Sequence, residues 1–199
     1  MDTMRHVMAE FLIVILPLVI LFWGMVHIAP AFWRRRGMTV TYTVAFLLLA
    51  CAAAALFYWR DAFLGRDLGT NWVLFVIGAV VYVIALVADR QTRRFLDFRT
   101  FAGVPELKGE SGTLLQSGPF AAVRHPRYTM VLVGVVAWSM MVNHTGTYAL
   151  AALFALGLWG IVQLEERDLR QRFGAAYGDY AKRVPQLLPR LSDVGLFFK

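Results

Sequence analysis

The most regular feature of the chain is a series of long apolar runs separated by short polar segments. Five such runs occur, at residues 11–29, 40–59, 70–88, 128–142 and 147–164. A helix needs roughly 20 mostly apolar residues to cross the hydrocarbon core of a bilayer. We therefore predict an all-α integral membrane protein with about five transmembrane helices. The first run is expected to be a retained helix, because "HIAPAFWRRR" after it lacks a small-residue cleavage site.

The fourth run is shorter than the others. A helix over 128–142 is about 22 Å long at a rise of 1.5 Å per residue. It reaches across a bilayer only if the "RHPR" and "NHT" segments at its two ends lie at the interfaces. A re-entrant hairpin formed by the fourth and fifth runs is the alternative.

Composition agrees with a membrane protein, and charge predicts its orientation. Hydrophobic residues make up 59% of the chain and charged residues only 17%, with a net charge of +7. If the runs alternate in direction, 17 of the 20 Lys and Arg residues fall on one side. By the positive-inside rule, the N-terminus is expected outside and the C-terminus in the cytoplasm. The positive charge is thus explained by membrane orientation, and no nucleic-acid partner is expected.

Two polar clusters are expected at the cytoplasmic face. The first is "RHPRY", residues 124–128, directly before the fourth run. Pro126 suits the first turn of a helix, where its missing N–H costs nothing. A helix N-terminus carries backbone N–H groups and partial positive charge that can hold an anion. Arg124 and His125 would add hydrogen-bonding groups beside it.

The second cluster is Glu165 and Glu166, with Gln163 nearby, at the cytoplasmic end of the fifth run. A carboxylate near a helix C-terminus meets an unfavourable dipole and needs a cation. The short link between the last two runs makes them antiparallel neighbours, which brings the two clusters together. They could form surface ion pairs, or a site with anion-binding and cation-binding groups. No metal-ligand spacing is present, so no metal is expected.

A family resemblance favours the second interpretation. The segments "SGPFAAVRHPRY" and "EERDLRQRFGAAYGDYAKRVPQLLP", separated by a helical hairpin, span about residues 105–190. They resemble the C-terminal half of the isoprenylcysteine carboxyl methyltransferase and phospholipid methyltransferase superfamily. These are integral-membrane enzymes that use S-adenosylmethionine. The resemblance implies methyl transfer from that cofactor to a hydrophobic or membrane-embedded acceptor.

Carried over residue by residue, the resemblance also implies a site. Cofactor contacts are expected from Gly112, Thr113, Leu114, Leu115, Phe120, His125, Pro126, Arg127, Tyr128 and Glu165. Glu165, Glu166, Gln163 and Arg124 are the expected catalytic residues. A C-terminal cytoplasmic helical segment, with Tyr177, Tyr180 and Arg183, is expected to close the pocket.

The expected organisation is one structural domain with two parts. Residues 1–89 form a three-helix transmembrane scaffold. Residues 90–199 form the catalytic part, with a cytoplasmic loop, the helical hairpin 126–166 and the cytoplasmic tail.

One departure from the resemblance concerns the acceptor. Family members that methylate prenylated cysteine place an arginine four residues before the glutamate, where this chain has Ile161. Gln163 or Arg167 would then orient an acceptor carboxylate, or the acceptor is an amine, such as a phospholipid, or a thiol. A nicotinamide-dependent, sterol-reductase-like enzyme and a non-catalytic membrane scaffold are the alternatives from other classes.

Overall fold

The computed structural model describes residues 1–96, 108 and 113–198 of the chain. Within them, the helices are α1 (Asp2–Ile28), α2 (Pro30–Arg36), α3 (Met38–Leu64), α4 (Trp72–Arg93), α7 (Pro119–Ala122), α8 (Pro126–Val142), α9 (Thr145–Phe173) and α10 (Ala175–Arg183), followed by the 3₁₀ helix η1 (Leu191–Phe198). The described residues contain no named β-strand.

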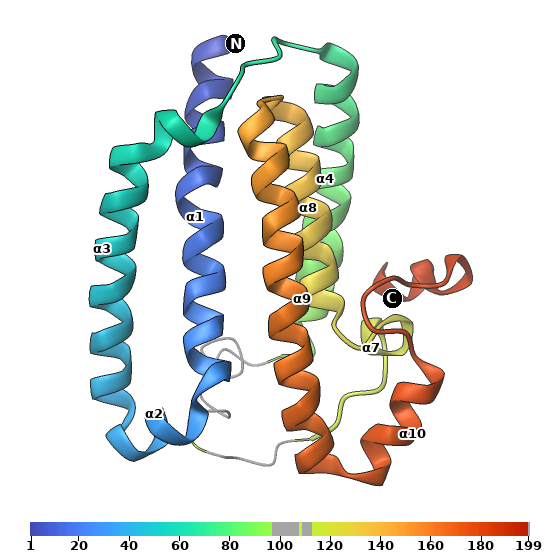
Figure 1. Cartoon of the computed structure of the whole chain (residues 1–199). Coiled ribbons are helices and arrows are strands. Elements are labelled where there is room, and N and C mark those ends of the chain that lie inside the picture. The colour runs from blue at the N-terminus through green and yellow to red at the C-terminus, as the bar shows by residue number, and fades with distance from the viewer. Residues whose placement is uncertain (97–107, 109–112, 199) are drawn as a thin grey trace.

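The five long helices lie side by side as a bundle (Figure 1). α4 packs along α8, and α1 packs against both α3 and α9. We call the end that carries α2, α7 and α10 the lower end, and the end that carries the start of α1 and the loop 65–71 the upper end (Figure 1). The basic segments at Arg34–Arg36, at the end of α4 and in α10 all lie at the lower end. The assignment of that end to the cytoplasm remains a prediction.

The prediction of about five membrane helices is confirmed. α1, α3, α4 and α9 are each long and apolar enough to span a bilayer, and α8 is a shorter apolar helix of 17 residues. The hairpin turn between α8 and α9 pairs with the loop that joins α3 to α4, because Leu68 N–H donates to Asn143 O and Thr145 N–H donates to Arg66 O. The hairpin therefore extends to the same end of the bundle as α3 and α4, which argues against a re-entrant arrangement.

Two helices run further than the sequence ranges suggested. α4 continues through Arg93, so the expected boundary at 89/90 falls inside a helix. α9 continues to Phe173, past the expected hairpin limit at 166, and Gly174 ends it with a positive φ of 53°. These polar helical turns carry the bundle beyond its apolar core and into the region of the site.

The core lies where α1, α8 and α9 meet. Its buried side chains include Leu12, Leu16, Val135, Phe154 and Leu158. α4 and α8 approach closely at Gly78, where a Cβ atom would lie only 2.6 Å from the carbonyl oxygen of Ala137. By contrast, many apolar side chains of α3 and α4 face outward, as expected for helices whose outer surface contacts lipid.

The upper end is held together by one buried guanidinium group. Arg5 is 1% exposed, and its Nη2 donates to both carboxylate oxygens of Asp67 at 2.8 and 2.9 Å. Its Nη1 donates to Val142 O at 2.7 Å and Gly69 O at 3.2 Å. Arg5 thus joins α1 to the α3–α4 loop and to the end of α8.

Asp67 is the anionic partner in this cluster. Burial acts to raise the pKa of Asp67, but the hydrogen bond from Gly69 N–H and the positive charges of His144 and Arg5 outweigh it and lower the pKa. Because the folded-state pKa is lowered, the ion pair contributes its stability at neutral pH and loses it as the pH falls through that pKa.

An Arg5→Ala substitution should destabilise the protein by about 3 kcal/mol, because it leaves two carbonyl groups and a carboxylate without their donor. Thermal unfolding in detergent micelles measures this effect. Arg35→Ala, an exposed arginine of α2, is the matched control, with an expected change within about 0.5 kcal/mol. Equal unfolding midpoints for the two variants would contradict the proposed role of Arg5.

Candidate active site

A pocket opens at the lower end where α1, α7, α8 and α9 meet. Its empty volume is about 490 Å³, a figure that includes the open space at its mouth. The lining residues are Trp23, His27, Leu96, Phe120, Arg124, His125, Pro126, Arg127, Tyr128 and Glu165. Seven of the predicted site residues therefore share one pocket: Phe120, Arg124, His125, Pro126, Arg127, Tyr128 and Glu165.

The "RHPRY" segment is fixed by backbone pairing with the C-terminal tail. The N–H groups of Arg124 and His125 donate to the carbonyl oxygens of Pro185 and Gln186. One turn later, Thr129 Oγ1 donates to Leu187 O at 2.7 Å. α8 then begins at Pro126 with no side-chain cap, and Pro126, Arg127 and Tyr128 of its first turn line the pocket.

Glu166 ties the segment to α9. Its side chain is 5% exposed and accepts a 2.6 Å hydrogen bond from Arg124 Nε. The same oxygen lies 3.3 Å from His125 Nε2, and the other oxygen accepts from Arg170 Nη2 at 3.2 Å. Arg124 Nη1 also donates to the carbonyl oxygens of Ala181 and Val184. The Glu166 carboxylate thus joins the "RHPRY" segment to α9, and Arg124 joins both to the C-terminal tail.

The expected reason for this cation pairing was wrong. The sequence predicted that Glu165 and Glu166 lie at the end of a helix, where the dipole would require a cation. In the structure they lie about two turns before the end of α9 at Phe173. Effects of the helix dipole fall off within the last turn, so burial of Glu166, rather than the dipole, accounts for its need of a cation.

Glu165 has the opposite environment. Its side chain lines the pocket and is 24% exposed, yet its Oε2 atom is buried. None of the described residues donates a hydrogen bond to that oxygen, and His125 Nδ1 lies 3.7 Å away. A buried carboxylate oxygen without a donor is costly. Glu165 can therefore accept a hydrogen bond from a bound cation.

Aromatic rings form the walls of the pocket. The rings of His125 and Tyr128 are stacked with centroids 5.8 Å apart, and Trp23 meets Tyr128 edge to face at 6.3 Å. Trp23 also stacks on His27 at 5.5 Å. Such faces can contact a flat aromatic ring or a cation.

The predicted lid residues do not line the pocket, but Tyr180 contacts a residue that does. Tyr180 donates to Phe120 O at 2.6 Å, and Arg183 Nη2 lies 3.3 Å from Gln116 Oε1. Tyr177 is 1% exposed. Burial raises the pKa of both Tyr177 and Tyr180, and the negative charge of Glu166 acts in the same direction. Both hydroxyls are therefore protonated at neutral pH.

Some predicted site residues lie elsewhere. Thr113, Leu114 and Leu115 are not among the residues that line the pocket, and Gly112 lies outside the described residues. Gln163 is on another face of α9, beside Arg167 and Arg170, where its amide lies 3.3 Å from Gln186 Oε1. Glu166 likewise lies outside the pocket lining. Roles for these residues in cofactor binding or catalysis remain predictions.

Three lining residues were not predicted as site residues, namely Trp23, His27 and Leu96. Trp23 and His27 lie one helical turn apart on α1, which was predicted to belong to the transmembrane scaffold. Their i, i+4 spacing places them on one helix face. This spacing was the available signal, but nothing in the sequence showed that the face meets α8.

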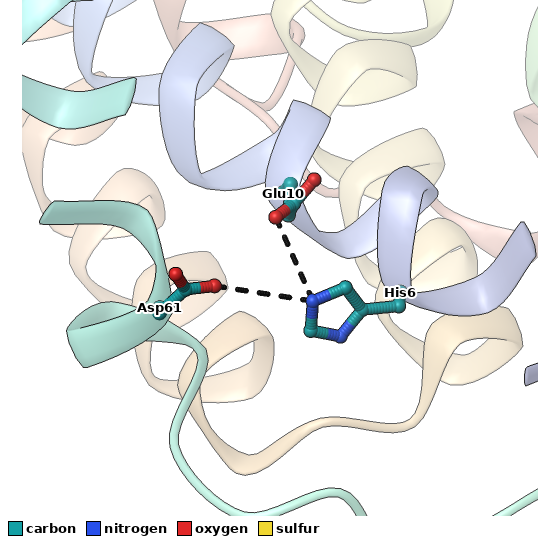
Figure 2. Close-up of side chains that lie close together, drawn as sticks. All are labelled: His6, Glu10 and Asp61. Carbon is teal, nitrogen blue, oxygen red and sulfur yellow. Dashed lines mark ion pairs between the residues drawn. The ribbon is translucent and has the colours of Figure 1, made fainter. Parts of the chain in front are cut away.

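A separate polar trio joins α1 to α3 near the upper end. Figure 2 shows His6, with its Nε2 atom 3.6 Å from Glu10 Oε1 and 3.9 Å from Asp61 Oδ1. These three side chains are close enough together to hold a metal ion. However, Glu10 Oε1 already accepts a 2.6 Å hydrogen bond from Arg60 Nε, which supplies a cation without a metal. The trio is therefore explained as an interhelical ion-pair cluster remote from the pocket.

Comparison with known proteins identifies the family. Residues 73–176 match the phospholipid methyltransferase family. The chain belongs to this family. A probable protein-S-isoprenylcysteine O-methyltransferase of Oryza sativa subsp. indica is 31% identical over 85% of this chain and 91% of its own length. The chain is thus a membrane methyltransferase.

Other relatives differ in their named activities. Methanethiol S-methyltransferase 2 of Bradyrhizobium diazoefficiens is 30% identical over 87% of this methyltransferase and 56% of its own length. A mouse Delta(14)-sterol reductase is 30% identical over 57% of this chain but only 28% of its own length. No solved structure gives a significant match.

The two adjacent glutamates should respond differently to the same change. Glu166→Gln should destabilise this methyltransferase by roughly 3 kcal/mol, because it leaves Arg124 in a largely buried position without its carboxylate. Glu165→Gln should change stability by less than about 1 kcal/mol, because no described side chain depends on the Glu165 charge for a hydrogen bond. Thermal unfolding of both variants in the absence of ligand tests this contrast. A similar loss in both would show that Glu165 is also part of the structural ion-pair cluster.

Proposed function

We propose that this chain transfers a methyl group from S-adenosylmethionine to a hydrophobic acceptor that reaches the site from the membrane. The observation that carries the proposal is the Glu165 carboxylate, whose buried Oε2 receives no hydrogen bond from any described residue. It lies in the same pocket as the start of α8 and several aromatic rings. The family relationship supports methyl transfer. The residues that line the pocket favour a ligand that combines an anionic group, a cationic group and a flat ring.

The lining residues fit the proposed cofactor. Glu165 would hold its ammonium group, and the start of α8 with Arg127 would hold its carboxylate. Phe120, Tyr128 and Trp23 would contact the adenine or the sulfonium. When bound, S-adenosylmethionine supplies an activated methyl group on a positively charged sulfur.

The chain's own contribution is alignment and exclusion of water. Methyl transfer is an in-line displacement, so fixed positions of the two reactants lower the barrier more than acid–base chemistry does. The ion pairs of Glu166 fix Arg124 and His125 within the wall of the pocket. The pairing of residues 124 and 125 with residues 185 and 186 holds the tail against the same wall.

The acceptor is proposed to differ from a prenylated cysteine carboxylate. Ile161 is 4% exposed and offers no charge. Gln163 and Arg167, the other candidates for holding a carboxylate, line a different surface from the proposed cofactor pocket. The positions of these residues support an amine or thiol acceptor instead.

The lower end is proposed to face the cytoplasm, with the N-terminus outside. The concentration of Arg and Lys at that end supports this orientation through the positive-inside rule. The cofactor would enter from the cytoplasm, and the acceptor would enter laterally from the bilayer.

Calorimetric titration of the purified protein with S-adenosylmethionine, and with its demethylated product, tests the proposal. We expect saturable binding to the wild type and at least about tenfold weaker binding to Glu165→Gln and His125→Ala, because each loses a polar contact inside the pocket. Gln171→Ala, at an exposed position of α9 outside the pocket lining, is the matched control and should bind normally.

Binding of neither compound, in a protein that is folded by thermal unfolding, would remove the proposed cofactor. Titration with a reduced nicotinamide cofactor would then test the reductase alternative, to which the partial similarity with a sterol reductase draws attention.

A further inference from the structure

One polar group in the pocket has no part in the proposed binding of the cofactor. His27, in the last turn of α1, lines the pocket and is 9% exposed. Its Nε2 atom is buried, and no described residue shares a hydrogen bond with it. A buried polar nitrogen without a partner is costly. Such an atom in the lining of a binding pocket is therefore expected to meet a group of a bound molecule.

The imidazole ring of His27 is held in place by neighbours on the first two helices. Trp23, one turn earlier on α1, stacks on it with ring centroids 5.5 Å apart and an angle of 18° between the ring planes. The same turn is fixed to α2, because Trp33 Nε1 donates a 2.8 Å hydrogen bond to Met25 O. His27 is thus a positioned side chain whose Nε2 atom takes no part in the hydrogen bonds of the described fold.

Three other polar side chains of the pocket lining are unsuited to accept a proton. The guanidinium groups of Arg124 and Arg127 carry only hydrogen-bond donors, and the phenol of Tyr128 is a weak base. A bound molecule that must lose a proton therefore depends on the remaining polar groups of the lining.

The remaining groups are His125, Glu165 and His27, and the first two are engaged. Both ring nitrogens of His125 face carboxylates, with Nε2 3.3 Å from Glu166 Oε1 and Nδ1 3.7 Å from Glu165 Oε2. These nitrogens are placed to donate rather than to accept. Glu165 is proposed to hold the ammonium group of the cofactor. Within the pocket lining, His27 is therefore the base best placed to take up a proton.

α1 also stands apart from the segments that are expected to bind the cofactor. The predicted cofactor contacts lie between residues 112 and 128 and at Glu165, all within the part of the chain that matches the family, residues 73–176. α1 lies outside this match. The family resemblance implies a shared cofactor, whereas the two methyltransferases compared above are named for different acceptors. We therefore assign the side chain from α1 to the acceptor rather than to the cofactor.

We propose that His27 accepts the proton that the methyl acceptor loses during transfer. This inference rests on the proposed function, which favours an amine or thiol acceptor. Each of these nucleophiles carries a hydrogen that is lost when the neutral methylated product forms. With its own proton on Nδ1, the neutral imidazole of His27 presents the lone pair of Nε2 to the N–H or S–H group of the acceptor.

The step balances in atoms and in charge. A lone pair of the nucleophile forms a bond to the methyl carbon while the carbon–sulfur bond of the cofactor breaks, and its electron pair stays on sulfur. The bond between the nucleophile and its hydrogen breaks, and the proton moves to Nε2. One positive charge is lost at the sulfonium and one appears on the imidazolium, so a pocket that also holds Arg127 gains no net positive charge. The imidazolium then returns the proton to water at the open mouth of the pocket.

The test uses two matched pairs of acceptors with the protein reconstituted in phosphatidylcholine nanodiscs. Hexanethiol is paired with benzenethiol, and hexylamine with aniline. In each pair the aromatic compound releases its proton more readily and depends less on a base. His27→Gln keeps a polar side chain without a basic nitrogen, and it should lower kcat/KM for the alkyl compound that is methylated by at least about tenfold. The loss for its aromatic partner should stay below about threefold.

Further variants separate proton transfer from packing. His27→Phe keeps a ring beside Trp23 and should lose activity as His27→Gln does. Imidazole added to His27→Ala should restore part of the rate, because it takes up the proton itself. His6→Gln, at an exposed histidine near the other end of α1, is the control and should keep wild-type rates. The thermal unfolding midpoint of His27→Gln without ligand should be nearly unchanged, since no described hydrogen bond is lost.

Nitrogen NMR of protein that is isotope-labelled at its histidine rings gives a readout without turnover. The demethylated product of the cofactor is added first, and hexanethiol or hexylamine second. The second addition should move the ring signals of His27, which are assigned by their absence from His27→Gln, and leave those of His6 and His144 in place. Unmoved His27 signals with both compounds would contradict a contact with the acceptor and overturn the inference.

The outcomes separate this inference from the proposed function. If the wild type binds neither S-adenosylmethionine nor its demethylated product, both are overturned. With normal cofactor binding, this inference alone is overturned by equal losses for both members of a pair, by wild-type rates in His27→Gln, or by transfer to none of the four compounds. Binding of S-adenosylmethionine to His27→Gln that is weaker by about tenfold or more would assign His27 to the cofactor and would also overturn it.

Discussion

The ion pairs of the Glu166 carboxylate are the constraint on which the candidate site depends. Glu166 is nearly inaccessible to solvent and lies on a helix that belongs largely to the membrane bundle. A charge in such a position requires partners, and Arg124 and His125 supply them from the start of α8. Arg124 in turn donates to the carbonyl oxygens of Ala181 and Val184. The pocket wall, α9 and the tail are therefore positioned together. A substitution that breaks these ion pairs should displace all three.

The two adjacent glutamates illustrate how helix geometry separates structure from function. Successive residues on an α-helix point about 100° apart. Glu166 consequently faces the arginines, whereas Glu165 faces the pocket with an oxygen that no described residue satisfies. His125 lies between them, with one ring nitrogen toward each carboxylate. The imidazole can thus couple the structural ion pairs to the occupancy of the pocket, because a cation held by Glu165 would alter the charge that His125 experiences.

The sequence predicted the features that depend on local pattern. Apolar run length predicted the number of membrane helices, and Pro126 predicted the start of α8. The short link at residues 143–144 placed "RHPRY" beside Glu165 and Glu166. Features that depend on helix packing were not predicted. Trp23 and His27 line the pocket only because α1 packs beside α8. This contact leaves no local signal in a single sequence.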